Sequence, residues 1–478
     1  MRFYGREQEL KVLRDTAEAS MINSQFTVVL GRRRIGKTTL MLKGSEGRRT
    51  VYLFISRLSE PVLCSRLQSV ARESSVEIPG KMETFGDLLE ALMLHSAHDP
   101  LTVIIDEFQN LRYVNPSIFG DMQRVWDLRK DEARMNLVVG GSVHSMMVRI
   151  FEDSGEPLFG RATRKLELRP FRVSDMKDIL SDHRPGWSNG DLLTLYMLTG
   201  GVPSYIGVLM DAGAFTSESM LDLALSPGSV FLREGNDLMT EEFGKDNRTY
   251  LSMLQLIASG RNQRPEIENT LKVSAGEYLR RLESEYGFVR RRLPIPGKDP
   301  RLGRWELTDM YLSFYFRYIQ PNASFVESGR FDLLRETVSR DLESYEGRVL
   351  EHYFLTRMSE ERRYTEIGGY WNRKGDVEID VVVLDSSDGT AELMEVKRNP
   401  AKLDMTALRR KAETLDGLLG GYSVTCIGLS MDDMRSHPGG GPVEARARSL
   451  RRPFPPSRRP WPLPLGLPPL ERRRPLSL

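Results

Sequence analysis

The chain has 478 residues, 40% hydrophobic and 28% charged, which is enough apolar material to bury cores and excludes a wholly disordered chain. No apolar run reaches the roughly 18 residues of a membrane span, and the charged N-terminus lacks the apolar core of a secretory signal. The two cysteines, Cys64 and Cys426, are typical of a protein of the reducing cytoplasm, which is the location we expect.

The net charge of +2 hides an uneven distribution along the chain. Residues 437–478 carry nine arginines, two glutamates and 11 prolines, whereas the other 436 residues carry 59 basic and 64 acidic groups. Contact between this mildly acidic body and nucleic acid would therefore depend on local basic patches. The proline-rich tail is predicted to be disordered. It is a flexible extension, the product of an altered reading frame, or a segment that docks nucleic acid or a partner.

Periodicity divides the rest of the chain into four segments. Residues 1–165 alternate short apolar strands with helices, which is typical of a parallel sheet covered on both faces, and residues 166–240 are helical. Residues 241–325 contain three helices and two strands joined by PGKDPRLG, the pattern of a winged helix-turn-helix. Residues 335–432 are expected to form a small α/β domain. Its expected helices are Leu342–Arg357 and Met405–Leu419, and its expected strands are Val377–Leu384, Ala391–Val396 and Ser423–Gly428. The expected strands of the first segment are Phe26–Leu30, Thr50–Ser56, Leu101–Ile105, Asn136–Gly140 and Lys165–Leu168.

The strongest motif is GRRRIGKT at residues 31–38, which fits the phosphate-binding pattern G-x-x-x-x-G-K-[ST] between a strand and a helix. Its consecutive N–H groups form an anion nest, Lys37 reaches the β- and γ-phosphates, and Thr38 contributes a hydroxyl to Mg²⁺. No N-K-x-D guanine-reading motif is present, so ATP and Mg²⁺ are the predicted ligands. The nucleotide-binding residues expected from the motif are Gly31, Arg32, Arg33, Arg34, Ile35, Gly36, Lys37, Thr38 and Thr39.

Two further strands end in residues suited to nucleotide hydrolysis. Asp106 and Glu107 follow the apolar strand LTVII; Asp106 would hold Mg²⁺ through water, and Glu107 would orient or deprotonate the attacking water. Ser142 ends the next strand and would sense the γ-phosphate, unless it is an ordinary strand-ending serine. Arg161 would serve as an arginine finger, in cis or toward a neighbouring copy, unless it is a plain surface residue.

Further motifs establish a resemblance to a known family. FYGREQEL at residues 3–10 matches the F-x-GRE-x-EL pattern of AAA-like and STAND-class P-loop ATPases. With GRRRIGKTT, IIDEFQ, GGS, PLFGR and GGVP, the chain resembles the archaeal-type ATPase family over about residues 1–430. The resemblance implies an ASCE-type sheet with Glu107 as hydrolytic base, and an adenine pocket near Gly5 and Arg6. It also implies a helical lid whose GGVP segment approaches the nucleotide, and a nuclease-like C-terminal domain. The proline-rich end after Met434 departs from the family pattern.

The expected winged helix-turn-helix carries arginines on its third helix, from Ser274 to Ser284, and on its first strand. A basic helix beside a basic wing suits the major groove of double-stranded DNA. Glu277, Glu283 and Glu285 interrupt this surface and would repel phosphates, so contact with protein, or packing within the chain, is the alternative. The candidate DNA contacts are Arg280, Arg281, Arg290, Arg291 and Arg292.

The C-terminal segment contains the pattern D-x₁₄-E-x-K, a form of the PD-(D/E)XK nuclease motif. Asp380 and Glu395, on adjacent expected strands, would chelate Mg²⁺, and Lys397 would position the attacking water. Glu351, on the preceding helix, would add a carboxylate. The alternatives are a nuclease-like fold kept for binding or structure, or a solvated strand face.

The sequence therefore predicts an α/β protein with a P-loop NTPase parallel sheet, a helical lid, a winged helix-turn-helix and a small α/β nuclease-like domain. Three functions remain open: an Mg-ATPase controlling DNA engagement or cleavage, a slow ATP-driven switch that binds protein partners or a second copy, and a DNA-binding regulatory ATPase.

Overall fold

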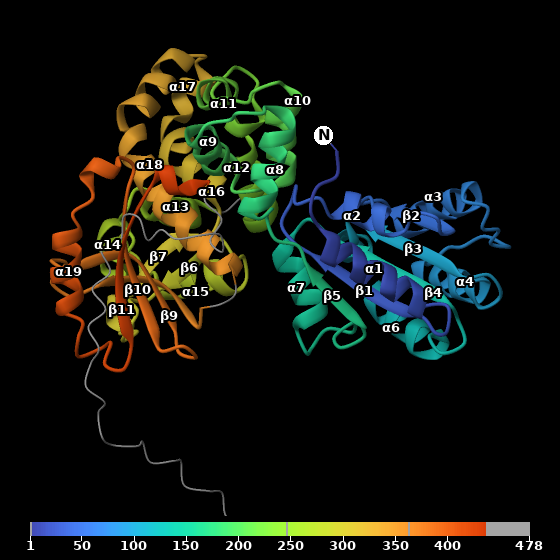
Figure 1. Ribbon diagram of the computed structural model, residues 1–478. Helices are drawn as coiled ribbons and strands as arrows, with labels where there is room; N and C mark the ends of the chain where they lie inside the picture. Colours follow the sequence, from blue (N-terminus) through green and yellow to red (C-terminus); the bar gives the residue numbers. More distant parts are fainter. Residues whose placement is uncertain (1, 245–246, 362–363, 436–478) are drawn as a thin grey trace, which may run out of the picture.

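The computed structural model describes residues 2–244, 247–361 and 364–435. The basic tail predicted to be disordered lies outside this part of the chain. Figure 1 shows two bodies: an N-terminal one holding α1–α7 and β1–β5, and a second one holding the helices from α8 onward and the strands from β6 onward. Among the described residues, no helix is long and apolar enough to cross a membrane.

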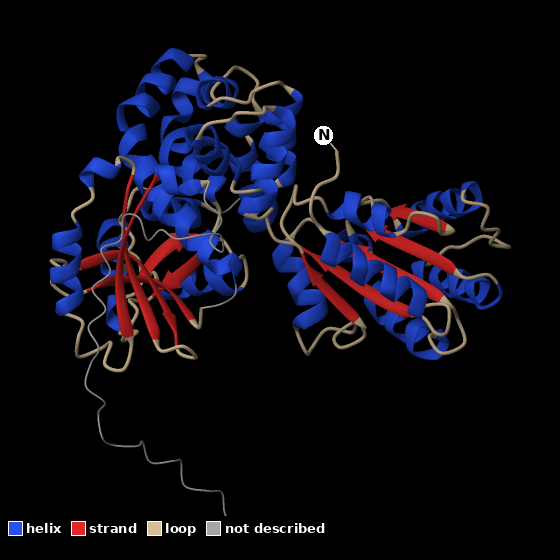
Figure 2. Cartoon of the chain, in the orientation of Figure 1, coloured by secondary structure: helices blue, strands red, loops and turns tan. Residues whose placement is uncertain are grey.

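The N-terminal body is a parallel sheet of five strands in the order β2-β3-β4-β1-β5, with helices on both faces (Figure 2). The central strands are buried along their whole length because helices cover both faces. The strands are β1 (Gln25–Leu30), β2 (Thr50–Phe54), β3 (Leu101–Asp106), β4 (Met135–Gly140) and β5 (Arg164–Glu167). The helices are α1 (Glu7–Ala19), α2 (Lys37–Gly44), α3 (Glu60–Glu73), α4 (Phe85–His98), α5 (Leu111–Val114), α6 (Ile118–Arg129) and α7 (His144–Glu152).

The helical segment that follows packs with the C-terminal half of the chain. One continuous core joins the face of the parallel sheet that carries Val29 and Val138 to α9, α13 and α18. Tyr196 of α9 lies 2.7 Å from Nδ1 of His352 and 2.8 Å from the hydroxyl of Thr356, both on α18. The helices of this segment are α8 (Val173–His183), α9 (Asn189–Thr199), α10 (Pro203–Asp211), α11 (Ser217–Ala224) and α12 (Glu234–Phe243).

The middle of the chain contains the three helices and two strands expected for a winged helix-turn-helix. They are α13 (Arg248–Ala258), α14 (Arg264–Leu271), α15 (Gly276–Ser284), β6 (Val289–Arg292) and β7 (Arg304–Leu307), the two strands pairing antiparallel. Leu279 and Leu282 of α15 are buried, whereas Tyr278 is only partly buried and packs edge-on against Tyr250. Two short helices follow, α16 (Met310–Phe314) and α17 (Ala323–Glu327).

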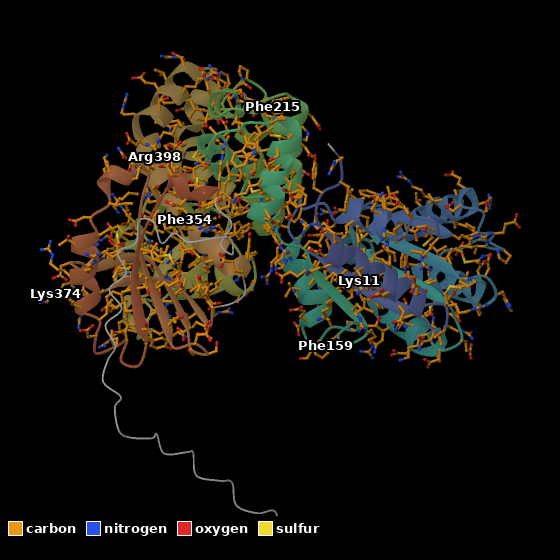
Figure 3. All side chains as sticks on the ribbon, in the orientation of Figure 1. Lys11, Phe159, Phe215, Phe354, Lys374 and Arg398 are labelled. Atoms are coloured by element: carbon orange, nitrogen blue, oxygen red, sulfur yellow. The ribbon has the colours of Figure 1, made fainter. Side chains whose placement is uncertain are left out.

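The C-terminal part is a four-stranded sheet in the order β11-β10-β9-β8, with α18 against one face and α19 against the other. The strands β10 and β11 run parallel and the other pairs antiparallel. Phe354 of α18 is buried in the core that joins this face to the lid (Figure 3). The elements are α18 (Phe331–Glu361), β8 (Glu366–Trp371), β9 (Glu378–Asp385), β10 (Thr390–Lys397), α19 (Met405–Glu413) and β11 (Ser423–Ser430).

This part differs from the sequence prediction in three places. The sequence suggested no strand at β8, because Gly368 and Gly369 weaken strand propensity and only pairing with β9 orders the edge. The helix α18 begins at Phe331, eleven residues before the expected Leu342, and α19 ends at Glu413 instead of Leu419. Helix ends are set by local packing more than by periodicity.

Candidate functional site

The loop between β1 and α2 has the geometry of a phosphate cradle. Gly31, Arg34 and Gly36 have positive φ values of 145°, 65° and 89°, which turn the backbone N–H groups inward before α2 begins. The Lys37 ammonium is buried and donates to the carbonyls of Gly31 (2.8 Å) and Arg32 (2.9 Å). Burial lowers the pKa of Lys37 to about 8, because desolvation disfavours the charged form more than the nearby carboxylates of Glu107 and Asp106 favour it. The loop therefore fits a polyphosphate anion.

Asp106 ends β3 directly opposite this loop. Its Oδ2 accepts a hydrogen bond from the Thr38 hydroxyl (2.6 Å) and another from the Tyr52 hydroxyl (2.9 Å), and its Oδ1 accepts from the backbone N–H of Glu107 (2.9 Å). The two side chains expected at Mg²⁺ are thus in contact, an arrangement that fits a divalent ion with bound nucleotide. The role of Tyr52 was not apparent in the sequence, because a tyrosine on a buried strand has no motif.

Glu107 stands in a left-handed conformation (φ 55°), and its carboxylate is held by neutral donors. The Ser142 hydroxyl donates to Glu107 Oε2 (2.7 Å) and so does Gln109 Nε2 (2.6 Å). The strand order places β4, which carries Ser142, between β3 and β1, as the sensor interpretation requires. Ser142 therefore contacts the expected base itself. Gln109 was missed, although it lies within the motif IIDEFQ.

The N-terminal motif joins the P-loop to the helical segment. Gly5 and Arg6 are both left-handed, and the Arg6 guanidinium donates to the carbonyls of Arg169 (2.6 Å) and Ile35 (3.4 Å) while lying 5.2 Å from the Phe171 ring centroid. A cavity of about 850 Å³ opens beside it; among its lining residues are Arg6, Phe171, Gly200 and Tyr196. This volume suits a nucleoside, so the expected adenine position near Gly5 and Arg6 has space.

The GGVP segment lies against the P-loop. Gly201 is left-handed (φ 80°), its carbonyl accepts from the Phe171 N–H (2.8 Å), and a Cβ there would lie 2.6 Å from the Phe171 carbonyl oxygen. The Ser204 N–H donates to the Arg34 carbonyl (3.4 Å), and Pro203 Cγ lies 4.0 Å from where a Cβ of Gly36 would be. Glycine is thus required here by the close approach of two backbones.

Two groups of expected nucleotide ligands are placed differently from the prediction. The side chains of Arg32, Arg33 and Arg34 point out of the loop and pair with acids of α12 and with Asp309, so in this structure only their backbone joins the cradle. Thr39 is exposed on the first turn of α2, whereas Ile35 is buried.

Arg161 lies at the wrong end of the sheet for a finger in cis. Its guanidinium pairs with Asp127 (3.2 Å) and donates to the Phe159 carbonyl (3.0 Å), beside the residues that begin β1. Figure 3 shows Phe159 at the lower edge of the N-terminal body. Because the P-loop follows the opposite end of β1, the length of the strand separates the two. The role in cis is therefore wrong, and only a role toward a neighbouring copy stays a prediction.

The arginines expected to contact DNA are paired within the chain. Arg280 pairs with Glu277 (2.5 Å), Arg281 with Glu285 (3.0 Å), and Arg292 with Glu306 (3.0 Å). Arg290 also pairs with Glu306, and Arg291 donates to the Pro300 carbonyl. Neighbouring acids thus neutralise most of the expected basic surface, which favours the alternative of packing within the chain.

The loop between β6 and β7 docks on the C-terminal sheet. The Ile295 N–H donates to the Gly369 carbonyl (2.9 Å), and the Ile295 side chain enters the core under β9 and β10. The indole of Trp371 donates to the Leu302 carbonyl (2.8 Å), and Lys298 pairs with Glu366 (3.0 Å). The wing and the sheet edge are therefore one packed unit, with the wing covering β8.

The antiparallel pairing of β9 with β10 brings the predicted nuclease residues together. Lys397 lies 3.4 Å from Asp380 and 2.9 Å from Glu395, and Lys411 of α19 lies 3.1 Å from Glu395. The Val396 N–H donates to Asp380 (2.8 Å). Among the described residues, no three histidine, cysteine or carboxylate side chains are grouped so as to hold a metal ion. The predicted metal site of three carboxylates (Glu351, Asp380 and Glu395) is therefore not formed in this structure, because both carboxylate oxygens of Glu395 pair with lysines, one with Lys397 and the other with Lys411.

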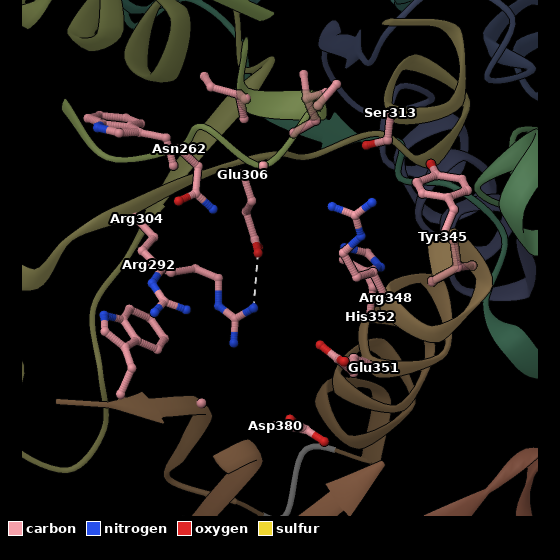
Figure 4. Close-up of a pocket in the computed structure, with 18 of the residues that line it drawn as sticks. Asn262, Arg292, Arg304, Glu306, Ser313, Tyr345, Arg348, Glu351, His352 and Asp380 are labelled. Carbon is pink, nitrogen blue, oxygen red and sulfur yellow. Dashed lines mark hydrogen bonds and ion pairs between the residues drawn. The ribbon is translucent and has the colours of Figure 1, made fainter. Parts of the chain in front are cut away.

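Glu351 and Asp380 both line a second cavity, of about 270 Å³, between α18, the wing and the sheet. Figure 4 shows Arg292 and Glu306 entering it from the wing, Glu351 from α18, and Asp380 at its base. Burial, and then the Asp380 carboxylate, raises the pKa of Glu351 to about 8, so this carboxyl group is mainly protonated at neutral pH. Burial lowers the pKa of the adjacent His352 to about 4, which leaves it neutral.

Comparison with known proteins defines the class. Residues 3–209 match a model of an ATPase domain found predominantly in Archaea, and residues 315–408 match one described as Archaea bacterial proteins of unknown function. An uncharacterized protein of Methanocaldococcus jannaschii, MJECL04, is 31% identical over 407 residues, which is 83% of this chain and 87% of the relative. The chain belongs to the archaeal-type P-loop ATPase family.

Solved structures agree on the fold. The Walker-type ATPase PABY2304 of Pyrococcus abyssi matches with a TM-score of 0.50 at 17% identity, covering 66% of this chain and 96% of that one. The ORC2 protein of Aeropyrum pernix, solved in complexes with ADPNP and ADP, matches with a TM-score of 0.48 at 16% identity, covering 69% and 96%. The two sheets of this chain and the likeness to the Pyrococcus protein confirm the predicted α/β architecture, a parallel P-loop sheet with a separate small C-terminal sheet.

Proposed function

We propose that this protein hydrolyses ATP with Mg²⁺ and that its nucleotide state sets the packing between the P-loop body and the C-terminal half. The observation that carries the proposal is the set of contacts around Asp106 and Glu107. One carboxylate is bound to the P-loop threonine, and the other is held by Ser142 and Gln109. Both lie at the edge of the sheet where the buried ammonium of Lys37 points at two carbonyls.

In the proposed hydrolysis of ATP, each residue of the site has a separate role. The P-loop N–H groups and Lys37 bind the phosphates, while Thr38 and Asp106 would hold Mg²⁺, which supplies charge neutralisation at the phosphates when bound. Glu107 accepts the proton of the attacking water, and Ser142 and Gln109 keep its carboxylate aimed. The test is Mg-dependent release of phosphate from ATP by the full chain, compared with the Glu107→Gln variant. No hydrolysis above the variant would contradict the proposal.

A second candidate function, metal-dependent cleavage of DNA, is supported by the contact of Lys397 with both Asp380 and Glu395. A divalent ion would have to take Lys397's place between these carboxylates. The test is nicking of supercoiled plasmid in Mg²⁺ and in Mn²⁺, with and without ATP, beside Asp380→Ala. Nicking by the variant at the wild-type rate would exclude this site, and the C-terminal domain would then be a non-cleaving adaptor.

A further inference from the structure

The three consecutive arginines of the P-loop connect it to the other half of the chain. Arg32 pairs with Asp309, which caps α16, and also contacts the Tyr205 hydroxyl (3.3 Å). Arg33 pairs with Glu241 near the end of α12, and Arg34 lies 2.7 Å from Glu234 at its start. The same helix thus meets the phosphate loop at both of its ends.

The start of α12 is a fixed anchor. The Glu234 side chain is fully buried and pairs with Arg34 (2.7 Å) and, at a longer distance, with Arg33 (3.7 Å), so withdrawing it from both arginines would leave an unpaired buried charge. The next residue, Gly235, donates its N–H to the Tyr311 hydroxyl (2.8 Å), and a Cβ there would lie 2.4 Å from the Tyr315 ring. This end of α12 therefore belongs rigidly to the C-terminal half.

The other end of α12 is held by contacts that can be exchanged. Arg33 and Glu241 have side chains that are 32% and 38% exposed, and ion pairs at such sites contribute little net stability. Glu242 accepts hydrogen bonds from the His144 N–H (2.9 Å) and from the hydroxyl of Ser145 (2.6 Å). Its carboxylate thus occupies the N-terminus of α7, a position suited to any anion.

Both acids at this end lie close to the hydrolytic residues. The helix α7 begins two residues after Ser142, which holds the expected base. The carboxylate of Glu242 acts electrostatically on Lys37, and that of Glu241 acts on Glu107. Glu241 and Glu242 are therefore placed on the γ-phosphate side of the nucleotide site. An added terminal phosphate would repel both, and would compete for Arg33 and for the N-terminus of α7.

We propose that Glu241 and Glu242 form a latch that distinguishes ATP from ADP. With ADP, or without nucleotide, Arg33 and the α7 N-terminus hold the two carboxylates, and α12 stays against the P-loop. With ATP, Arg33 and the α7 N-terminus bind the terminal phosphate instead of the two carboxylates. The C-terminal end of α12 then leaves the P-loop, while Glu234 at the start of α12 keeps its contacts. This inference rests on the proposed ATP binding and adds its regulation: α12 is the element that reports the γ-phosphate to the C-terminal half.

The experiment compares wild type, the double variant Glu241→Gln with Glu242→Gln, and the matched control Asp237→Asn, an exposed acid on the same helix. Titrations with ADP and with a non-hydrolysable ATP analogue give the two dissociation constants. Hydrogen exchange of residues 234–243 is measured in each state. In wild type and in the control, the ATP analogue raises exchange above the ADP level. The double variant is expected to bind the ATP analogue about tenfold more tightly with ADP affinity unchanged, and to exchange rapidly with either nucleotide.

The following results would contradict the latch or the proposed function. If exchange of α12 is the same with ADP and with the ATP analogue in wild type, the latch is wrong even though nucleotide binds. If the double variant changes both affinities by the same factor, the two acids affect only overall charge. If wild type binds neither nucleotide, the proposed function itself fails. The single variant Glu241→Gln, which leaves the Glu242 cap intact, should give an intermediate shift and guards against misfolding of the double variant.

Discussion

The nucleotide site and the C-terminal acidic site are built alike and charged differently. Both bring two carboxylates close to a lysine, at the end of β3 and the start of α2 in the first site and on the paired strands β9 and β10 in the second. At the first site Lys37 donates to neutral carbonyls and Glu107 accepts from neutral donors, so neither charge is hydrogen-bonded to an opposite charge before a ligand binds. At the second site Lys397 already pairs with Asp380 and Glu395, and Lys411 adds a further cation. The first is preorganised for an anion, whereas the second must exchange an internal cation before it binds a metal.

The largest expected effect falls on hydrolysis at the first site. Glu107→Gln removes the proton acceptor but keeps the hydrogen-bonding shape, so kcat should fall by about 10²–10⁴ with nucleotide affinity nearly unchanged. Phosphate release and a nucleotide titration on the same preparation measure the two quantities. Glu77→Gln, an exposed acid between α3 and α4, is the control. A loss of affinity equal to the loss of kcat would mean that Glu107 serves binding and not catalysis.

The next effect is a pH dependence that only the first site should show. Free Lys37 has a pKa lowered to about 8, and phosphates raise it in the complex because they favour the charged form. Binding above pH 8 therefore requires proton uptake, and affinity should fall by up to about tenfold for each further pH unit. Below pH 7 affinity should be flat. Lys37→Arg, which stays charged, should lose the dependence above pH 8. If the nucleotide affinity of wild type stays constant up to pH 9.5, the predicted dependence on the Lys37 proton is wrong.

A smaller effect tests the internal cation of the second site. Lys397→Met leaves Asp380 and Glu395 with one lysine fewer, so the free energy of unfolding should fall by about 1–2 kcal/mol in metal-free buffer. Mn²⁺ should restore more stability in the variant than in wild type, since it takes the vacated place. Thermal unfolding with and without Mn²⁺ measures this, with the exposed Lys374→Met as control. Equal responses of variant and wild type would show that no metal site lies beneath Lys397.

The smallest expected effect tests whether the nucleotide site is complete within one chain. Arg161 lies at the far end of the sheet and pairs with Asp127, so Arg161→Ala should leave the hydrolysis rate of dilute protein within about twofold. The rate is compared across protein concentration. A loss that appears only at high concentration would show that Arg161 completes the site of a neighbouring copy.

Much of the first site was predictable because its residues are close together in short motifs. Strand, loop and helix follow one another at GRRRIGKT, and an acidic pair ends an apolar strand, so local rules suffice for Lys37, Thr38, Asp106 and Glu107. Tyr52 was missed because its hydrogen bond to Asp106 joins separate strands, whereas Gln109 is only two residues from Glu107 and was missed because the motif assigned it no role. Arg161 was misplaced although it precedes β5, because in a parallel sheet the residues before one strand lie at the opposite edge from the loop that follows another.

The amino-acid sequence by itself determined the fold class, the phosphate loop and the pairing of Asp380, Glu395 and Lys397, since periodicity and spacing act within one or two elements. The tertiary structure alone decided which charges neutralise one another. It placed the wing against β8, two lysines at Glu395, and Arg33 and Arg34 of the P-loop on α12. These pairings are between residues up to about two hundred positions apart, such as Arg33 with Glu241, and the free energy of an ion pair depends on distance and burial that no local pattern encodes.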